Sequence, residues 1–304
     1  MRERRVGLLL AAPLALAVAF SYVRLLATTG DVPSDDDYIA ARALLDKSGF
    51  DKAHDALAIL PPWSLRPLRN FGDLDPIGAD HIANKPLERW ARLWAVEESG
   101  ADKERAPLVT RLGPPAFSAR AGKATLERWD LAPATEAPRV LFDLRAHIED
   151  ASVSIVDDTG AHLCTSPIKA GVMCGREAWQ RVQREWLLVS ENADLAVWSH
   201  PPKSGRLEIE WPAVALGSSI VVQAGFTREG ADAAKAPVRL HVLVDGAEVG
   251  VVVRTPQSLG GSFSFDVDRI DTRASAGKVG KLTLAIESDD NASAHFAWDA
   301  AVLR

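Results

Sequence analysis

The sequence of 304 residues lacks the short motifs that mark many enzyme classes. It contains no Gly-x-Ser-x-Gly nucleophile elbow, no phosphate-binding loop and no glycine-rich dinucleotide fingerprint. Neighbours such as Ser199 and His200 do not indicate a catalytic triad, because the members of a triad meet only in the folded chain. We therefore predict no catalytic residues, and we expect a binding protein rather than an enzyme.

Long basic runs are also missing after the first few positions. Lys and Arg together number 35 against 41 for Asp and Glu, a net charge of -6, which disfavours a nucleic-acid partner. Hydrophobic residues make up 47% and charged residues 25%, as in ordinary globular proteins, so wholesale disorder is excluded. A chain of this length forms one large domain or two modest ones.

Tyrosine is scarce, with two Tyr against nine Trp. A tryptophan ring has a large apolar face and a single donor, which suits the core of a sandwich and stacking on a sugar alike. Because large side chains are buried more often than they bind ligands, we expect most of these rings in the core.

One long apolar run is present, from Val6 to Val23, and three arginines lie within the five residues that precede it. This pattern is typical of a secretory signal or an N-terminal anchor, and about 20 residues cross a bilayer. We predict an uncleaved signal-anchor helix over 1–27 and a polar spacer over 28–37, with the rest of the chain extracytoplasmic. A cleaved signal is the alternative, because Ala17-Val-Ala19 suits a signal peptidase.

The only two cysteines, Cys164 and Cys174, flank a short loop that contains Pro and Gly. In an oxidising compartment this spacing predicts a disulfide, worth about 2–3 kcal/mol in the chain-entropy model. A metal site is the alternative, but His162 is the only further ligand type close by.

Residues 38–131 alternate helix-forming and strand-forming segments. The short apolar runs Asp55–Leu60 and Arg92–Glu97 are typical of strands buried on both faces. Helices are expected over Tyr38–Lys47, with a cap near Ser34 to Asp36, and over Asp102–Arg111. The pattern predicts a small, parallel, three-layer α/β domain over 38–131, followed by a linker rich in Ala and Pro.

From residue 139 onward the helical signal nearly vanishes, and short alternating runs are broken by turn residues. Val238, Leu240, Val242 and Val244 would share one face of a strand, with Arg239 and His241 on the other. Asp245-Gly246 is a favoured two-residue hairpin turn. We predict an antiparallel β-sandwich over 139–304. The expected fold class is therefore α+β, with an anchor helix, a small α/β domain and a sandwich.

Five segments near the C-terminus form a recognisable series: Val242–Gly246, Asp268–Thr272, Leu282–Ile286, Asp289–Asn291 and His295–Ala300. With them, the stretch from Gly250 to Leu303 resembles a jelly-roll sandwich of the galactose-binding-like type, closest to the novel putative carbohydrate-binding module. This resemblance implies a sandwich fold and a carbohydrate partner.

Residues 38 to 131, with Leu60-Pro-Pro-Trp63 and Arg92–Val96, resemble the extracytoplasmic tail of polytopic membrane glycosyltransferases. The many membrane helices and the acidic catalytic loop of those enzymes are absent from this sequence. Transferase activity therefore does not follow from the resemblance.

The candidate ligand side of the sandwich is Trp198, Asp289, Asp290, Asn291 and His295. Three consecutive oxygen-bearing side chains on one loop can hold Ca²⁺ or bond sugar hydroxyls, so Asp289 and Asp290 are also the candidate calcium ligands. A purely structural polar hairpin loop is the alternative, and apart from Ca²⁺ no cofactor is expected.

The last strand supplies the geometry of this hypothesis. Phe296 and Trp298 share one face and belong in the core, so His295 and Asp299 are expected to point outward. Trp198 would add a stacking ring, unless it lies in the core of the sandwich.

A second acidic cluster consists of Asp73, Asp75, Asp80 and His81. It does not fit the calcium-loop pattern, and the preference of Asp for turns and helix caps explains these residues at least as well.

Three functions follow. The first is a membrane-anchored accessory protein that binds glycans or cell-envelope polymer. The second is a hydrolase or transferase acting on glycans, with its site at the junction of the two domains. The third is a structural subunit of a membrane complex, which binds protein through sheet edges or apolar patches.

Overall fold

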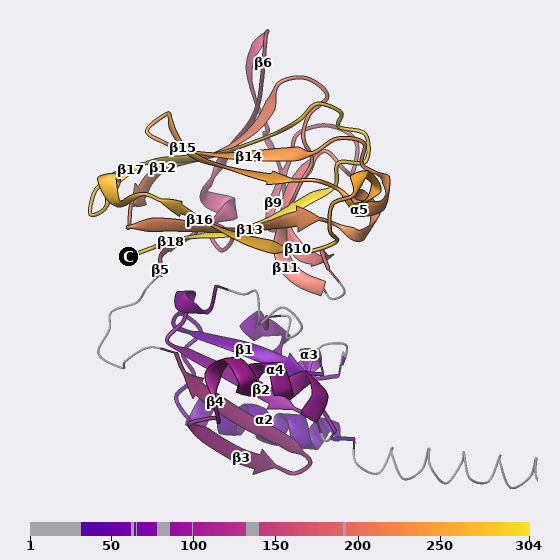
Figure 1. Cartoon of the computed structure of the whole chain (residues 1–304), viewed down its shortest axis with the longest axis vertical. Coiled ribbons are helices and arrows are strands. Elements are labelled where there is room, and N and C mark those ends of the chain that lie inside the picture. Colours follow the sequence, from indigo (N-terminus) through magenta and orange to yellow (C-terminus); the bar gives the residue numbers. More distant parts are fainter. Residues whose placement is uncertain are drawn as a thin grey trace, which may run out of the picture.

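The computed structural model describes residues 32–61, 64, 66–77, 86–98, 100–131, 140–190 and 193–304. We call residues 32–131 the N-terminal unit and residues 140–304 the sandwich (Figure 1). The expected anchor over 1–27 and the first part of the spacer, 28–31, lie outside the described residues, and the end of the expected spacer, Asp35–Asp37, forms the first turn of helix α2 (Asp35–Lys47). Within the described ranges, every helix is too short or too polar to cross a membrane.

The N-terminal unit contains one sheet of four strands in the order β1-β2-β4-β3. Its strands are β1 (Asp55–Leu60), β2 (Arg92–Glu97), β3 (Phe117–Ala121) and β4 (Ala124–Asp130). Its helices are α2 (Asp35–Lys47), α3 (Leu68–Phe71) and α4 (Asp102–Leu112), with 3-10 turns η1 (Gly72–Leu74) and η3 (Leu87–Arg89).

The two longer helices cover opposite faces of this sheet. Ser34 caps α2 as predicted, since its Oγ accepts from Asp37 N (3.2 Å) while the Asp37 carboxylate accepts from Ser34 N (2.7 Å). Tyr38 and Leu45 of α2 pack on one face, and Leu108 of α4 packs on the other. The continuous apolar runs of β1 and β2 are thereby buried on both sides.

The expected purely parallel sheet is wrong. β1 and β2 are parallel, but β2 pairs with β4 and β4 with β3 in antiparallel register. The sequence prediction missed β3, whose burial alternates residue by residue at the edge of the sheet. A tight turn at Gly122, with φ of +60°, brings β3 back along β4.

The sandwich consists of two antiparallel sheets that pack face to face (Figure 1). The eight-stranded sheet has the order β16-β13-β18-β11-β10-β9-β8, with β5 also pairing with β18, and the six-stranded sheet has the order β15-β14-β17-β12-β6-β7. The strands are β5 (Val140–Asp143), β6 (Ser152–Asp157), β7 (Gly160–Leu163), β8 (Ser166–Ile168), β9 (Gly171–Met173), β10 (Arg181–Leu188), β11 (Ala193–Ser199), β12 (Arg206–Ala215), β13 (Ser219–Phe226), β14 (Val238–Val244), β15 (Ala247–Arg254), β16 (Asp266–Asp271), β17 (Val279–Ser288) and β18 (Phe296–Leu303). The short helices are α5 (Arg228–Ala233), η4 (Ile148–Asp150), η5 (Gln257–Leu259) and η6 (Arg273–Ser275).

The core of the sandwich follows the alternation of its strands. Phe296 and Trp298 of β18 are fully buried in it, as predicted from their shared face. The hairpin between β14 and β15 turns at Asp245 and Gly246, both with positive φ, which confirms the two-residue turn.

The antiparallel β-sandwich is confirmed, but the expected α+β class led by a membrane helix is wrong. Fourteen of the strands, β5 to β18, belong to the sandwich, and the longest described helix, α2, has 13 residues. The physical reason is that, among the described residues, the alternating strands of the sandwich outnumber the few short helices. Helix α3, for example, is a single turn that begins after Pro67.

The two units meet at a buried arginine. Arg89, whose side chain is 2% exposed, donates from Nη1 to Asp299 Oδ2 (2.7 Å) and from Nη2 to Asp143 Oδ2 (3.0 Å). In Figure 1 the N-terminal unit lies below the eight-stranded sheet, where β5 and β18 face it. Asp299 therefore leaves the core face of β18 as expected, but it is buried at this junction rather than exposed.

Candidate functional site

A pocket of about 210 Å³ opens at one end of the sandwich, between its two sheets. We call it the Trp179 pocket. Its lining comes from β6 and β12 of the six-stranded sheet, and from the start of β10 and the segments that follow β9 and β11 of the other sheet. The lining residues are Ile155, Asp157, Cys174, Trp179, Gln180, Arg181, His200, Pro202, Lys203, Ser204 and Leu207.

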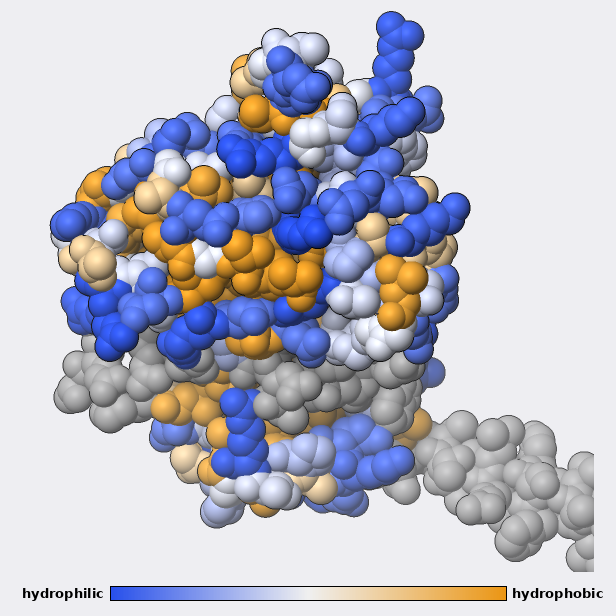
Figure 2. All heavy atoms as spheres, turned by 45° about the horizontal axis from the view of Figure 1, so that its top comes forward, coloured by the Kyte–Doolittle hydropathy of each residue, from blue (hydrophilic) through white to orange (hydrophobic). Residues whose placement is uncertain are grey.

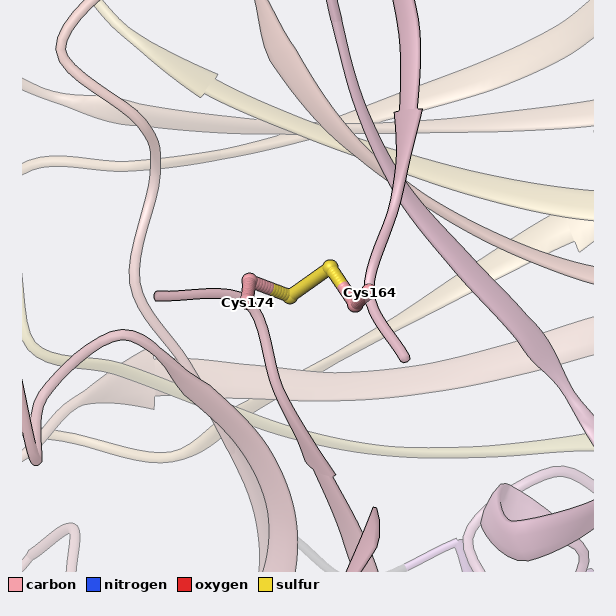
Figure 3. The surroundings of a disulfide bond; sticks show 2 residues. All are labelled: Cys164 and Cys174. Atoms are coloured by element: carbon pink, nitrogen blue, oxygen red, sulfur yellow. A yellow bond between two sulfur atoms is a disulfide. The ribbon is translucent and has the colours of Figure 1, made fainter. Parts of the chain in front are cut away.

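A disulfide between Cys164 and Cys174 lies beside this pocket (Figure 3). Cys164 follows β7 of the six-stranded sheet and Cys174 follows β9 of the eight-stranded sheet, so the bond joins the two sheets. The predicted disulfide is confirmed. Both half-cystines pack against the edge of the sandwich core, and Cys174 forms part of the pocket wall.

Trp179 is the exposed member of a cluster of four rings. Its side chain is 38% exposed, and its ring centroid lies 4.6 Å from that of His200. Behind it, His200 contacts His295 at 5.5 Å, and His295 contacts Trp198 at 4.9 Å. The cluster therefore forms a short stack that begins at the pocket and ends inside the sheet.

Polar contacts fix the stack in place. Trp198 donates from Nε1 to the carbonyl oxygen of Trp179 (3.3 Å), and the Arg181 guanidinium lies 4.6 Å from the Trp198 ring centroid. Arg181 also donates to Glu185 Oε1 (2.6 Å). These contacts hold the Trp179 loop against the strands behind it, so its ring is presented in a defined orientation.

The two histidines of the cluster, His200 and His295, both have a lowered pKa, which favours the neutral imidazole. Burial lowers the pKa of His200, its hydrogen bond to the Pro201 carbonyl opposes the shift, and the nearby His295 adds to it. Burial lowers the pKa of His295 as well, against the attraction of Glu229 and with the repulsion of Arg181. At neutral pH the stack behind Trp179 is therefore an uncharged one.

The structure brings together only part of the predicted ligand side. Trp198 and His295 are in contact, but Trp198 is 8% exposed and lies behind the pocket rather than in it. Asn291 approaches the pocket from outside, since its Nδ2 donates to the Pro201 carbonyl oxygen (3.3 Å) and so supports the loop that carries Pro202 and Lys203.

The two aspartates of that loop have other contacts. Asp289 binds Arg239 with both carboxylate oxygens, at 3.1 and 2.9 Å, and this pairing lowers the pKa of Asp289. Asp290 accepts from the backbone N–H of Ala292 (2.9 Å), a loop-stabilising hydrogen bond. In the ranges that the structure describes, no three His, Cys, Asp or Glu side chains are grouped to hold a metal ion, which includes the candidate calcium loop.

The other regions that the sequence singled out are occupied by ion pairs. Asp73 accepts from Arg42 and Asp75 lies 2.8 Å from Lys52, whereas Asp80 and His81 lie outside the described residues. At the junction, where a glycan-active enzyme would have had its site, Arg89 and Arg145 both pair with the carboxylates of Asp143 and Asp299.

Apolar side chains also reach the surface of the six-stranded sheet. Val251 and Val253 of the edge strand β15 are exposed, as is Val279 of β17. Figure 2 shows apolar side chains in a band across one face of the sandwich, between rows of polar ones. This is the type of surface that the structural-subunit hypothesis requires.

Sequence reasoning missed Trp179 and the residues around it. The available signal was a tryptophan within Gly175-Arg-Glu-Ala-Trp-Gln180, an otherwise polar segment directly after a cysteine. An aromatic residue in a polar loop lacks the alternation that would place it in a core, which favours an exposed role.

No family model matches the chain. No curated protein matches it either. Among solved structures, a family 51 carbohydrate-binding module from Clostridium perfringens in complex with methyl-galactose matches 45% of this chain and 94% of its own, with 16% identity and a TM-score of 0.31. A family 61 module in complex with β-1,4-galactotriose covers 54% of this chain and 96% of its own, with 15% identity and a TM-score of 0.31.

A xylan-binding module of family 15 matches 43% of this chain and 88% of its own, with 8% identity and a TM-score of 0.26. The expected likeness to carbohydrate-binding modules is thus found in part, whereas the likeness of the N-terminal half to glycosyltransferase tails has no support among these structures. Likenesses this distant carry no argument about the ligand of this chain.

Proposed function

We propose that this chain is an extracytoplasmic glycan-binding protein and that the Trp179 pocket is its binding site. The observation that carries the proposal is the exposed Trp179 ring at a pocket with polar groups on its rim. Sugar recognition requires one flat apolar face and hydrogen-bonding partners at its edge. Ser204 and Lys203 supply such partners from the loop opposite Trp179, and both are exposed.

The rigidity of the site supports this function. The disulfide at Cys174, the hydrogen bond from Trp198 and the contact from Asn291 hold the two loops that form the pocket. A pre-formed site loses little conformational freedom on binding, which favours recognition of weakly binding polar ligands. The disulfide also supports an extracytoplasmic location, because such bonds persist in oxidising compartments.

A glycan array probed with the full-length chain tests the proposal, followed by titration of the best glycan. Trp179→Ala is expected to weaken binding at least about 10-fold, because stacking on an aromatic ring and its area of contact are lost. Trp186→Ala is the matched control, since Trp186 lies on β10, is 41% exposed and does not line the pocket.

Equal loss in the two variants, or binding unchanged by Trp179→Ala, would place the glycan site elsewhere. A chain that binds no glycan on the array, while its unfolding shows that it is folded, would overturn the proposed function.

A further inference from the structure

The floor of the Trp179 pocket is apolar. Ile155 of β6 and Leu207 of β12 lie directly opposite each other in antiparallel register, and both line the pocket. Leu207 belongs to the sandwich core and is 2% exposed, while Ile155 packs against that core from its edge. Cys174 adds its half-cystine to the same surface, so the pocket reaches down to the end of the core.

The polar groups lie at the mouth or are already engaged. Lys203 and Ser204 are exposed on the β11–β12 loop. The Asp157 Oδ1 accepts from Thr159 N (2.8 Å) and Oγ1 (2.6 Å), and the Gln180 Oε1 accepts from Glu177 N (3.1 Å). A ligand therefore meets hydrogen-bonding partners at the rim and aliphatic carbon at the floor.

A pocket with a polar rim and an apolar floor favours some sugars over others. A hydroxyl group pressed onto Ile155 and Leu207 would lose its hydrogen bonds to water and gain no partner, which is unfavourable. A methyl group in the same place would bury apolar surface and complete the packing of the floor. In a hydrophobic pocket one such group changes affinity by about 10-fold or more.

We infer that the Trp179 pocket takes a sugar that carries a methyl-bearing substituent, with the ring on Trp179 and the methyl group on the Ile155–Leu207 floor. The inference rests on the proposed glycan-binding function. Two kinds of sugar have this chemistry: N-acetylated amino sugars, through the acetamido methyl, and deoxy sugars, through a methyl in place of a hydroxymethyl group.

Calorimetric titration of the full-length chain with matched sugars tests the inference. Glucose is compared with N-acetylglucosamine and with 6-deoxyglucose, and galactose with N-acetylgalactosamine and with 6-deoxygalactose. In at least one series, one of the two methyl-bearing sugars is expected to bind about 10-fold or more tightly than its parent. The acetamido and deoxy arms show which source supplies the methyl group.

Two variants connect the preference to the floor. Ile155→Thr introduces a hydroxyl there and is expected to reduce the affinity ratio between the methyl-bearing and parent sugars severalfold. Val156→Thr is the control, because the neighbouring residue on a strand points to the opposite face and Val156 does not line the pocket. The wild-type sugar series decides the matter even if Ile155→Thr fails to fold.

Parent sugars that bind as tightly as their methyl-bearing partners would overturn this inference and leave the proposed function standing. A preference that persists in Ile155→Thr would also overturn it, since the methyl group would then lie elsewhere. The proposed function fails separately, through the glycan array and the Trp179→Ala variant.

Discussion

Burial shifts the pKa of a glutamate in the N-terminal unit and of two histidines in the sandwich, in opposite directions. In the N-terminal unit, burial and the charge of Glu127 raise the pKa of Glu97 to about 7, while Arg105 opposes the shift. In the sandwich, burial lowers the pKa of His200 and of His295. One cause, the loss of water around a charge, therefore favours a proton on the acid and disfavours one on the base.

Each unit buries some of its ion pairs and leaves others in solvent. In the N-terminal unit the fully buried Asp55 carboxylate accepts from Arg92 at 2.8 and 2.7 Å, and Glu127 accepts from Arg105. Several pairs of the sandwich, such as Asp271 with Arg273, lie in solvent. Sheets buried on both faces have no outer surface for charge, so polar groups at the ends of their strands must be paired inside.

The largest expected loss of stability is at the junction, where the buried ion pair of Arg89 and Asp299 links the two units. Asp299→Ala leaves the Arg89 guanidinium buried without its closest carboxylate and should lower the free energy of unfolding by about 3–5 kcal/mol. Urea denaturation measures this loss. Asp271→Ala, which breaks an exposed pair, should cost less than about 1 kcal/mol.

A double variant, Arg89→Met with Asp299→Leu, should recover much of the stability, because it removes both charges together. If Asp299→Ala proves as mild as Asp271→Ala, the junction is not a buried contact, and the two units behave independently.

The second effect concerns the covalent link within the sandwich. Replacing Cys164 and Cys174 by serine frees a loop with a sequence separation of 10 and should destabilise the chain by about 2–3 kcal/mol. The loss should also weaken ligand binding, because Cys174 forms a wall of the Trp179 pocket. Thermal unfolding and titration on the same samples measure both; unchanged stability would contradict the expectation.

The third expected effect is that the two units contribute to the free energy of unfolding with opposite dependence on pH. A lowered pKa means that the histidine pair contributes stability above the unfolded value of about 6.5, and this contribution is lost as the pH falls. A raised pKa means that Glu97 contributes stability below its ordinary 4.5, and this contribution is lost as the pH rises through about 7. Between pH 7.5 and 5 the two contributions therefore change in opposite directions.

Urea denaturation at pH 7.5 and pH 5 distinguishes them. Glu97→Gln should make the chain lose more stability on acidification than the wild type does, because the compensating gain is removed. His200→Gln combined with His295→Gln should make it lose less. If Glu97→Gln and the double histidine variant change the loss of unfolding free energy between pH 7.5 and pH 5 in the same direction, the expected opposition of the two units is wrong.

The sequence made strands easier to predict than the site. Asp55–Leu60 and Arg92–Glu97 were located to the residue, because buried strands are continuous apolar runs bounded by polar residues. The edge strand β3 was missed, since half of its residues face solvent and its pattern is weak. The disulfide followed from two cysteines and a short spacing alone.

The site depended on contacts that no local pattern encodes. Trp179 lies on the loop between β9 and β10 and Leu207 lies on β12 of the other sheet, so only the packing of the sandwich brings them to one pocket. His295 was correctly associated with Trp198, but their burial behind Trp179 depends on a loop that local sequence did not mark. Asp299 was expected in solvent, because nothing in β18 itself indicates that Arg89 covers it.

The smallest effects are expected in the loop over Asp289–Asn291, and they compare the predicted site with the observed one. Asp290→Ala and Asn291→Ala should each change the free energy of unfolding by no more than about 1 kcal/mol, as exposed loop substitutions usually do. Asn291→Ala removes the hydrogen bond to Pro201 and should weaken binding at the Trp179 pocket by about 2–10-fold, the value of one hydrogen bond.

Asp290→Ala should leave binding unchanged, because the Asp290 carboxylate contacts its own loop and lies outside the pocket lining. The same titration measures both variants, with unfolding as the control for stability. If Asp290→Ala abolishes binding while Trp179→Ala does not, the ligand binds at the acidic loop, as the sequence suggested. The Trp179 pocket would then not be the binding site. The Asp289–Asn291 loop supports that pocket only through the hydrogen bond from Asn291 to Pro201, so Asp290→Ala could not abolish binding there.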